Sequence, residues 1–319
     1  MRDCIELANQ TQSSTIIFAV SGVITLISPL PYISQHNTTI DGGNDITISI
    51  DCNEFSGLII DANYCMLNCI SIYNSSKYSL KIKGNNNSIT GCYFGFDFNG
   101  IKKFSKDNGI VLDLYTNNNI IGSNHNHISG YTSNIIGNYS KNGIYAIKSN
   151  TNSIQNNYIG ICPDRVSRAS CEENVIYLYK CNEWYIGGDV FINSNGEVNN
   201  PTGSKGLIPP TFVKPLLGNT ISGNKKHGIF CEKCSNFTFQ GNFIGTDYTG
   251  NISCENHENG IYINKCSYMN IQGCYLNNPP FVFYNILSGN GKNGLDVNDS
   301  NYTTIQGNFF VFLPIIICL

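Results

Sequence analysis

The sequence predicts an all-β, right-handed parallel β-helix, a solenoid in which successive coils of chain stack on one another. The first observation is a tripeptide, Asn-Gly-Ile or a close variant, that returns along the 319 residues. Anchored on its Ile or Leu, the six copies are separated by 34, 32, 53, 32 and 34 residues. A period in this range is typical of repeat arrays. The second observation is that apolar and polar residues alternate after each copy, as they do in strands.

The first strand of each coil follows the tripeptide, and its inward face is aliphatic. The anchor column consists of Ile110, Ile144, Ile176, Ile229, Ile261 and Leu295, and two residues later stand Leu112, Ala146, Leu178, Cys231, Ile263 and Val297. Side chains alternate across a strand, so the residues between these columns point outward. They are Val111, Tyr145, Tyr177, Phe230, Tyr262 and Asp296.

A second strand begins about ten residues after most anchors, as in Ile154 to Ile159 and Phe239 to Ile244. Asn157, Asn242 and Asn308 share a column there, and stacked turn asparagines bond the backbone and one another. A third short strand recurs in alternate coils, which makes the true period 66 residues. The longer step of 53 residues predicts an inserted loop near 190–217, rich in Pro and Gly.

These repeats resemble a known pattern. Gly241 to Asn251, Gly218 to Asn224 and the opening segments Arg2 to Asn9, Ile16 to Leu26 and Thr39 to Gly42 are similar to right-handed parallel β-helix repeat proteins of the pectin-lyase-like superfamily. The resemblance covers almost the whole chain and implies the fold. It leaves function open, because such proteins include enzymes, adhesins and surface proteins without an assigned activity.

The repeat divides the chain into three parts. Residues 1–50 form an N-terminal entry segment with the first coil, residues 51–308 form the coils, and residues 309–319 form an apolar tail outside the repeat. The pattern begins at Met1 and stops at Asn308, so we expect a fragment that lacks a complete C-terminal cap.

The amino-acid composition limits the classes of partner that we expect for this protein. Only 13% of residues are charged and the formal net charge is -3, which implies no basic surface for nucleic acid. The apolar stretch Thr15 to Ile33 is broken by Ser, Gly and Pro, so two short strands fit it better than a membrane span. No secretory signal is visible. The resemblance nevertheless implies an extracellular or surface location.

Two outward rows are candidates for carbohydrate binding. Four residues past the anchor stand Lys148, Lys180, Lys233 and Lys265, and beside them run Tyr145, Tyr177, Phe230 and Tyr262. Stacked like charges are unfavourable, so the repulsion has to be offset by Glu232 nearby, by solvent and splayed rotamers, or by an anionic ligand such as a uronate chain. The simpler interpretation is a self-stacked aromatic ladder with lysines extended over it.

Outward carboxylates are the weak catalytic candidates. Glu232 and Asp299 lie two coils apart, which at about 4.8 Å per coil places them roughly 10 Å from each other, at the edge of the separation used by inverting glycosidases. A solvated face is the preferred interpretation, because charged residues there need no special explanation. His227, in the partial Gly-His-Gly echo Lys226 to Gly228, takes the Asn position of the repeat and is interpreted as a turn residue.

The sequence predicts no metal site. Cys231 and Cys234 form a lone Cys-x-x-Cys without a second pair for zinc, and calcium is expected only if the chain is a lyase. Asp97 and Asp247 suit Asx-turns better than calcium ligation. Cys162 and Cys171 are compatible with a loop disulfide or with free thiols.

Two functional hypotheses follow. The first is a non-catalytic surface or extracellular scaffold that binds polysaccharide through the Tyr145 to Tyr262 face. The alternative is a polysaccharide lyase or glycoside hydrolase that acts on an acidic polysaccharide. A flat ladder favours the scaffold, whereas a cleft with converging carboxylates or a calcium site favours the enzyme.

Overall fold

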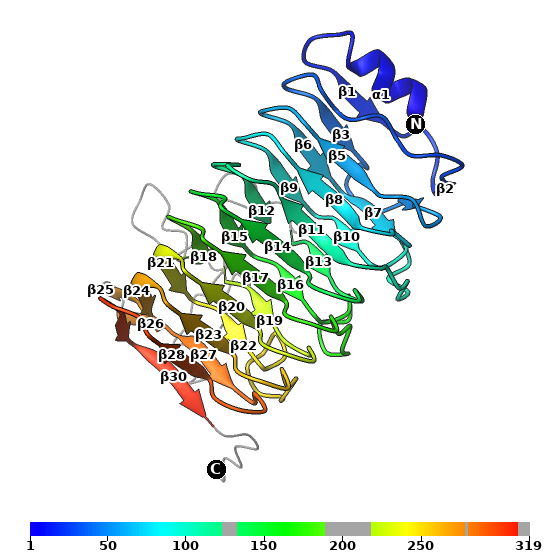
Figure 1. The fold of residues 1–319 in the computed structure, drawn as a ribbon. Coiled ribbons are helices and arrows are strands. Elements are labelled where there is room, and N and C mark those ends of the chain that lie inside the picture. The colour runs from blue at the N-terminus through cyan, green and yellow to red at the C-terminus, as the bar shows by residue number, and fades with distance from the viewer. Residues whose placement is uncertain (123–132, 189–217, 278–279, 312–319) are drawn as a thin grey trace.

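The chain is a right-handed parallel β-helix. A computed structural model describes residues 1–122, 133–188, 218–277 and 280–311. Three parallel sheets, here called sheets A, B and C, run the length of the stack from the N-terminal to the C-terminal end (Figure 1). Sheets A and B have 10 strands each and sheet C has 8. Each coil except the first and the last contributes one strand to each sheet in turn.

Sheet A holds β1 (Thr15–Ile17), β3 (Thr39–Asp41), β6 (Met66–Asn68), β9 (Ser88–Thr90), β12 (Ile120–Gly122), β15 (Ser153–Gln155), β18 (Tyr185–Gly187), β21 (Ser235–Gln240), β24 (Ser267–Gln272) and β29 (Thr304–Gln306). Sheet B holds β2 (Gly22–Thr25), β4 (Ile48–Asp51), β7 (Ile70–Tyr73), β10 (Tyr93–Phe94), β13 (Ile135–Ile136), β16 (Tyr158–Ile159), β19 (Thr220–Ile221), β22 (Phe243–Ile244), β27 (Asn285–Ser288) and β30 (Asn308–Val311). Sheet C holds β5 (Leu58–Ile60), β8 (Tyr78–Ile82), β11 (Asn108–Leu112), β14 (Ile144–Ile147), β17 (Ile176–Tyr179), β20 (Ile229–Glu232), β23 (Ile261–Asn264) and β28 (Leu295–Asn298).

The predicted columns of the first strand are the columns of sheet C. Ile110 pairs with Ile144, Ile144 with Ile176, and the series continues through Ile229 and Ile261. All five are fully buried in one continuous aliphatic core. Burial of such side chains contributes about 1.5–3 kcal/mol each, so the inward columns supply the main driving force for stacking.

Close contact between coils explains the glycine of the recurring tripeptide. A Cβ atom on Gly109 would lie 2.4 Å from the carbonyl oxygen of Gly143, and one on Gly228 or Gly260 would lie 2.6 Å from the equivalent oxygen in the next coil. Such distances are far inside van der Waals contact. Glycine is therefore required at these positions by the packing of one coil on the next.

A ladder of buried asparagines runs along the corner between sheets A and B. Asn219 Oδ1 accepts from the backbone N–H and from Nδ2 of Asn157, at 2.9 and 3.0 Å. Asn219 Nδ2 in turn donates to Asn242 Oδ1 at 2.9 Å. The same pattern continues through Asn285 to Asn308. The predicted stack of Asn157, Asn242 and Asn308 is thus real, but it is longer than the sequence indicated.

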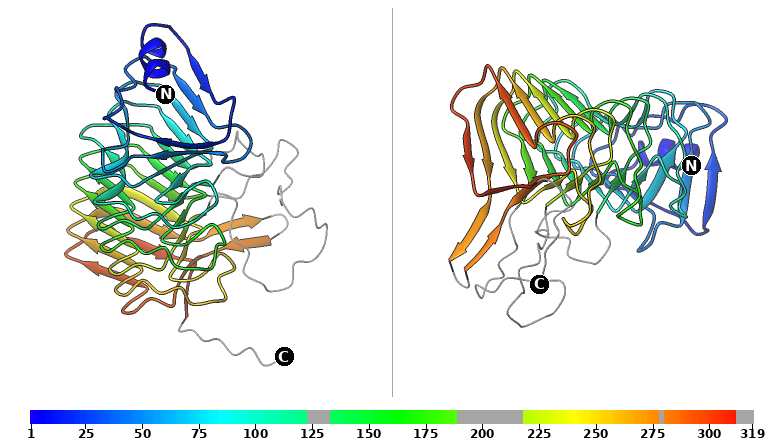
Figure 2. Two further views of the ribbon diagram at one scale, coloured as in Figure 1. Left: turned by 90° about the vertical axis from the view of Figure 1, so that its right-hand side faces the viewer. Right: turned by 90° about the horizontal axis from the view of Figure 1, so that it is seen from below.

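The extra members come from the alternate coils. Asn134, Asn219 and Asn285 head the strands that the sequence analysis placed in a separate third set, yet these strands pair with their neighbours in sheet B. The two sets are therefore one column. After β24 the chain adds a hairpin, β25 (Cys274–Asn277) and β26 (Pro280–Phe283), before it enters sheet B. The hairpin projects from the stack (Figure 2). The loop predicted near 190–217 lies outside the described residues.

Both ends of the stack differ from expectation. Helix α1 (Arg2–Ala8) was not predicted, and it buries Ile5 and Ala8 over the first coil at the N-terminal end (Figure 1). At the other end β30 pairs with β27 as far as Val311, so residues 309–311 belong to the repeat and not to a separate tail. Residues 312–319 lie outside the part described.

Thr15 to Ile33 contains the two short strands β1 and β2, as predicted. Among the described residues, no helix combines the length and the apolar character that crossing a membrane requires.

The asparagine ladder predicts a large effect of one amide. Asn219→Ala removes the acceptor of two buried donors, so we expect it to lower the free energy of unfolding by about 3 kcal/mol. Asn99→Ala, in an exposed turn, should change it by less than about 0.5 kcal/mol. Urea denaturation of both variants measures the difference. Equal midpoints would show that the ladder does not stabilise the stack.

Candidate functional site

The outward surface of sheet C carries the residues that the sequence singled out. Tyr145, Tyr177, Phe230 and Tyr262 lie in register on β14, β17, β20 and β23. Each is partly exposed, whereas the residues on either side of it in the strand are buried. We call these four residues the aromatic row.

The rings of the aromatic row stack on one another. Successive ring centroids are 5.2, 5.1 and 5.3 Å apart, with interplanar angles of 9, 4 and 18°. Each inner ring therefore has a neighbour against both faces, and ring edges face the solvent. This geometry is the flat ladder that the sequence analysis associated with a scaffold. Carbohydrate binding by these residues stays a prediction.

A row of lysines follows the same strands at the corner between sheets C and A. Lys148, Lys180, Lys233 and Lys265 are all exposed. They have left-handed backbone torsions, with φ of 51, 54, 55 and 54°. Because the torsion is nearly the same in all four turns, the four lysine side chains leave the backbone at equivalent positions. These four residues are called the lysine row below.

Two members of the lysine row converge on one tyrosine. The ammonium groups of Lys180 and Lys233 each lie 5.2 Å from the centre of the Tyr179 ring. Lys233 Nζ also donates to the Tyr179 hydroxyl at 3.3 Å, and this bond is the main cause that lowers the pKa of Tyr179. In the described part of the chain, Lys233 is the one member of the row in an ion pair, with Glu232 at 3.5 Å.

The two candidate carboxylates do not share a column. Glu232 aligns with Asn264 on β23, which aligns with Asn298 on β28. Asp299 is the next residue along, in an exposed left-handed turn with φ of 45°, and continues the column of the lysine row. A catalytic role for either residue stays a prediction.

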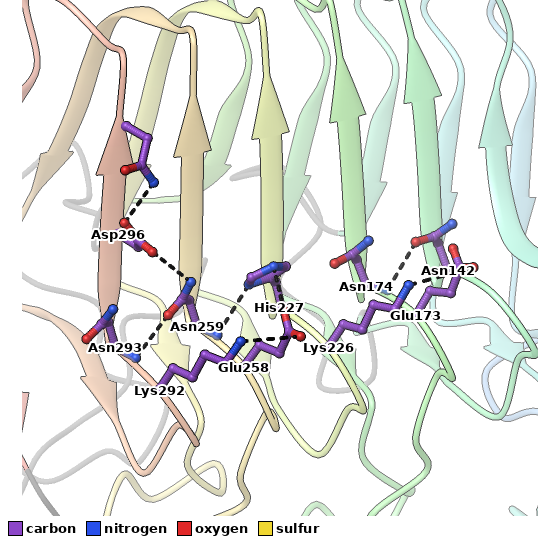
Figure 3. Close-up of polar contacts among 11 residues, drawn as sticks. Asn142, Glu173, Asn174, Lys226, His227, Glu258, Asn259, Lys292, Asn293 and Asp296 are labelled. Carbon is purple, nitrogen blue, oxygen red and sulfur yellow. Dashed lines mark hydrogen bonds and ion pairs between the residues drawn. The ribbon is translucent and has the colours of Figure 1, made fainter.

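A second charged row, which sequence reasoning missed, lies at the opposite end of the sheet C strands. The residue before each Asn-Gly, or before its variant, is charged, and the sign of the charge alternates along the stack. These residues are Asp107, Lys141, Glu173, Lys226, Glu258 and Lys292. Neighbours pair, with Lys141 to Asp107 at 2.6 Å, Lys226 to Glu173 at 3.9 Å and Lys292 to Glu258 at 3.6 Å. Figure 3 shows the part of this row from Glu173 to Lys292. Reading the column one residue earlier would have found it. We call it the alternating row.

His227 interrupts the asparagine column beside the alternating row (Figure 3). Its Nδ1 accepts the backbone N–H of Asn259 at 3.2 Å, and its Nε2 lies 2.8 Å from a carboxylate oxygen of Glu258. The proton of the neutral ring is therefore assigned to Nε2. Burial, the largest cause, lowers the pKa of His227 from its ordinary value of 6.5, and the Glu258 carboxylate opposes the shift.

The substitution leaves one acceptor unsatisfied. In the preceding coils Asn142 Nδ2 donates to Asn108 Oδ1 at 3.0 Å. Asn174 Oδ1, the last asparagine before His227, is buried without a hydrogen-bond partner. An imidazole in this position accepts from Asn259 but supplies no amide to Asn174. His227 is thus a turn residue of the repeat. Its presence lowers the stability of the folded protein, because a buried acceptor is left without a hydrogen bond.

These contacts predict that His227→Asn stabilises the protein by about 1 kcal/mol at neutral pH, because it supplies the missing donor. The unfolded chain protonates His227 near its ordinary pKa, whereas the folded protein resists protonation. Stability should therefore fall in the wild type as pH drops below about 6.5, and fall less in the variant. Thermal unfolding from pH 7.5 to 5 measures this. His257→Asn, at an exposed site, is the matched control; an unchanged pH slope in His227→Asn would contradict the assignment.

Among the described residues, the cysteines form no disulfide and no metal site. Cys162 and Cys171 are free thiols, as are Cys181, Cys231, Cys234 and Cys266 in the core. Burial raises the pKa of the Cys171 thiol to about 12, so it is not a reactive thiolate. In the described segments, no group of three or more His, Cys, Asp or Glu is placed to hold a metal ion. Asp97 and Asp247 accept from backbone N–H groups of their own turns.

Three parallel sheets around one aliphatic core settle the architecture. This is the fold of the pectin-lyase-like proteins that the sequence resembles. No family model matches the chain, and no curated protein matches it.

Solved structures to which the chain is similar include two alginate epimerases and an alginate lyase. A mutant of the periplasmic alginate epimerase AlgG matches with 12% identity and a TM-score of 0.44, over 86% of this chain and 49% of its own. The alginate lyase AlyF-OU02 matches with 9% identity and a TM-score of 0.45, over 92% of this chain and 61% of its own. The A-module of the Azotobacter vinelandii mannuronan C-5 epimerase AlgE6 matches with 10% identity and a TM-score of 0.44, over 99% and 94%. The chain thus spans about half the length of AlgG.

Proposed function

We propose that this protein is a β-helical scaffold that binds an acidic polysaccharide lengthwise, with the carboxylates of the ligand against the lysine row. The observation that carries the proposal is the row itself, four exposed lysines in consecutive coils. Stacked coils are about 4.8 Å apart, so adjacent ammonium groups repel one another unless a counter-charge lies between them.

The alternating row makes this repulsion significant. There the chain places opposite charges in consecutive coils, and they pair at 2.6 to 3.9 Å. The fold would also allow alternating charges at the position of the lysine row. For Lys148, Lys180 and Lys265, however, the described residues provide no ion-pair partner. A chain with only 13% charged residues thus concentrates uncompensated positive charge on one corner. A polyanion with regularly spaced carboxylates would supply the compensation.

The aromatic row supports the same orientation of ligand. Its rings are already stacked, so sugar rings do not insert between them. Tyr145, Tyr177 and Tyr262 instead contribute phenolic hydroxyl groups on strands whose next turn carries the lysine row. Hydroxyls both donate and accept, which suits the oxygen-rich edge of a polysaccharide.

The test is binding of polygalacturonate and alginate, measured by calorimetry at low salt. Lys148→Ala, Lys180→Ala, Lys233→Ala and Lys265→Ala combined should weaken binding by about 30-fold, since exposed ion pairs contribute about 0.2–1 kcal/mol each. Raising the ionic strength to 0.5 M should weaken wild-type binding in the same direction.

The matched control removes the same number of positive charges elsewhere. Lys141→Ala, Lys225→Ala, Lys226→Ala and Lys292→Ala combined should leave affinity within about threefold of the wild type. Each of these lysines pairs with a carboxylate in the protein. Equal loss in both quadruple variants would indicate unspecific charge attraction, and no binding by the wild type would refute the proposal.

A polysaccharide lyase or glycoside hydrolase is the second candidate, and Tyr179 is the observation that favours it. A tyrosine with a lowered pKa between two lysines is a candidate general base. Incubation with the same polymers, with and without calcium, should then yield product that Tyr179→Phe abolishes. Loss of product in Glu232→Ala or Asp299→Ala would assign a carboxylate role. The scaffold proposal expects no product from any of these proteins.

A further inference from the structure

An open hollow lies on the outer surface of sheet A, near the C-terminal end of the stack where β21, β24 and β29 are neighbours. Its volume is about 580 Å³. The lining residues are Asn236, Tyr268, Asn270, Tyr302, Thr303 and Thr304. Every one of them is uncharged. The hollow therefore differs in character from both charged rows of sheet C.

Two tyrosines form the apolar part of the hollow. The rings of Tyr268 and Tyr302 are parallel within 10°, with centroids 4.8 Å apart. Tyr268 is 53% exposed and Tyr302 is 72% exposed. One face of Tyr302 lies against Tyr268, and the exposed fraction of its side chain leaves the other face open to solvent. In the aromatic row, by contrast, the rings are only partly exposed.

The backbone holds both rings away from the core. Tyr268 and Tyr302 have left-handed φ values of 54 and 53°, which are uncommon for bulky residues. The preceding member of the column, Asn236, has the same torsion. The Tyr268 N–H donates to the carbonyl of Asn301 at 3.1 Å, which ties the two turns together. The same torsion recurs at this turn in earlier coils, at Asn118, Thr151 and Glu183, so the turn directs the side chain at this position away from the core along the stack.

Polar groups stand beside the rings. Asn270 on β24 pairs in register with Thr304 on β29, and both are outward residues of sheet A. With Asn236 they provide amide donors, amide acceptors and a hydroxyl around the tyrosines. An aromatic face with a few convergent neutral polar groups is a typical arrangement for a small polar ligand with one apolar face.

We propose that this hollow binds one pyranose ring of a neutral saccharide. The C–H face of the sugar packs on the open face of Tyr302, and its hydroxyls bond to Asn270, Thr304 and Asn236. The uncharged lining favours a neutral sugar over a uronate, because a carboxylate would be desolvated there without a cation among the lining residues. The site is separate from the lysine row and does not depend on polyanion binding.

The experiment is calorimetric titration with cellohexaose, mannohexaose and chitohexaose. We expect the wild type to bind at least one of them. Tyr302→Ala should weaken that binding about tenfold, the loss of one aromatic contact of about 1.4 kcal/mol. Tyr302→Phe should retain it, because the ring face remains.

Tyr115→Ala is the matched control, since Tyr115 is another exposed tyrosine in a left-handed turn, with φ of 64°. The Tyr115→Ala protein should bind the hexaose as the wild type does. The variant with all four residues of the lysine row replaced by Ala should do the same. Far-ultraviolet circular dichroism checks that each variant is folded. Binding of none of the three hexaoses would overturn the proposal, as would equal loss in Tyr115→Ala or loss in the lysine variant.

Discussion

Hydrogen bonding between buried asparagines along the corners sets the register on which the rest of the structure depends. In a parallel stack, aliphatic inward columns favour burial but tolerate small shifts, whereas an amide that bonds its counterpart above and below does not. Asn157, Asn219 and Asn242 each bond the next coil with both side-chain and backbone groups. A slip of one residue would turn the inward side chains outward and leave several buried polar groups unpaired.

The register of the coils also determines which side chains line up on the outer surface. Once coils are locked in step, any residue type repeated at one position becomes a straight row. The chain uses this in two ways. Opposite signs at the alternating row neutralise each other, as Lys141 and Asp107 do at 2.6 Å. Like signs at the lysine row are left for a ligand or the solvent to compensate. His227 shows the converse, since one exception to the asparagine column leaves Asn174 Oδ1 unsatisfied.

The repeat made the fold predictable from the sequence. The anchors Ile110 to Ile261 and their outward neighbours could be placed in strands because side-chain alternation and a fixed period leave few alternatives. Helix α1 could not, because seven residues at the end of a stack carry no periodic signal. The identity of the two strand sets in sheet B was hidden by insertions between sheets A and B, which displace equivalent asparagines in sequence.

The geometry of the candidate site was harder to predict from the sequence than the fold. The sequence placed Tyr145, Tyr177, Phe230 and Tyr262 side by side, but whether rings lie flat toward a ligand or against one another depends on rotamers set by neighbouring coils. The Tyr268 and Tyr302 pair was missed because tyrosines occupy this column in consecutive coils only at the last two coils, after Asn236.

The most direct measurement is a crystal structure of the protein with an acidic oligosaccharide of six uronate residues. The account predicts a ligand that runs along the stack, with carboxylates within hydrogen-bond distance of Lys148, Lys180, Lys233 and Lys265 and with the sugar chain over the edges of the aromatic row. An oligosaccharide bound across the coils, or on a face without the lysine row, would contradict it.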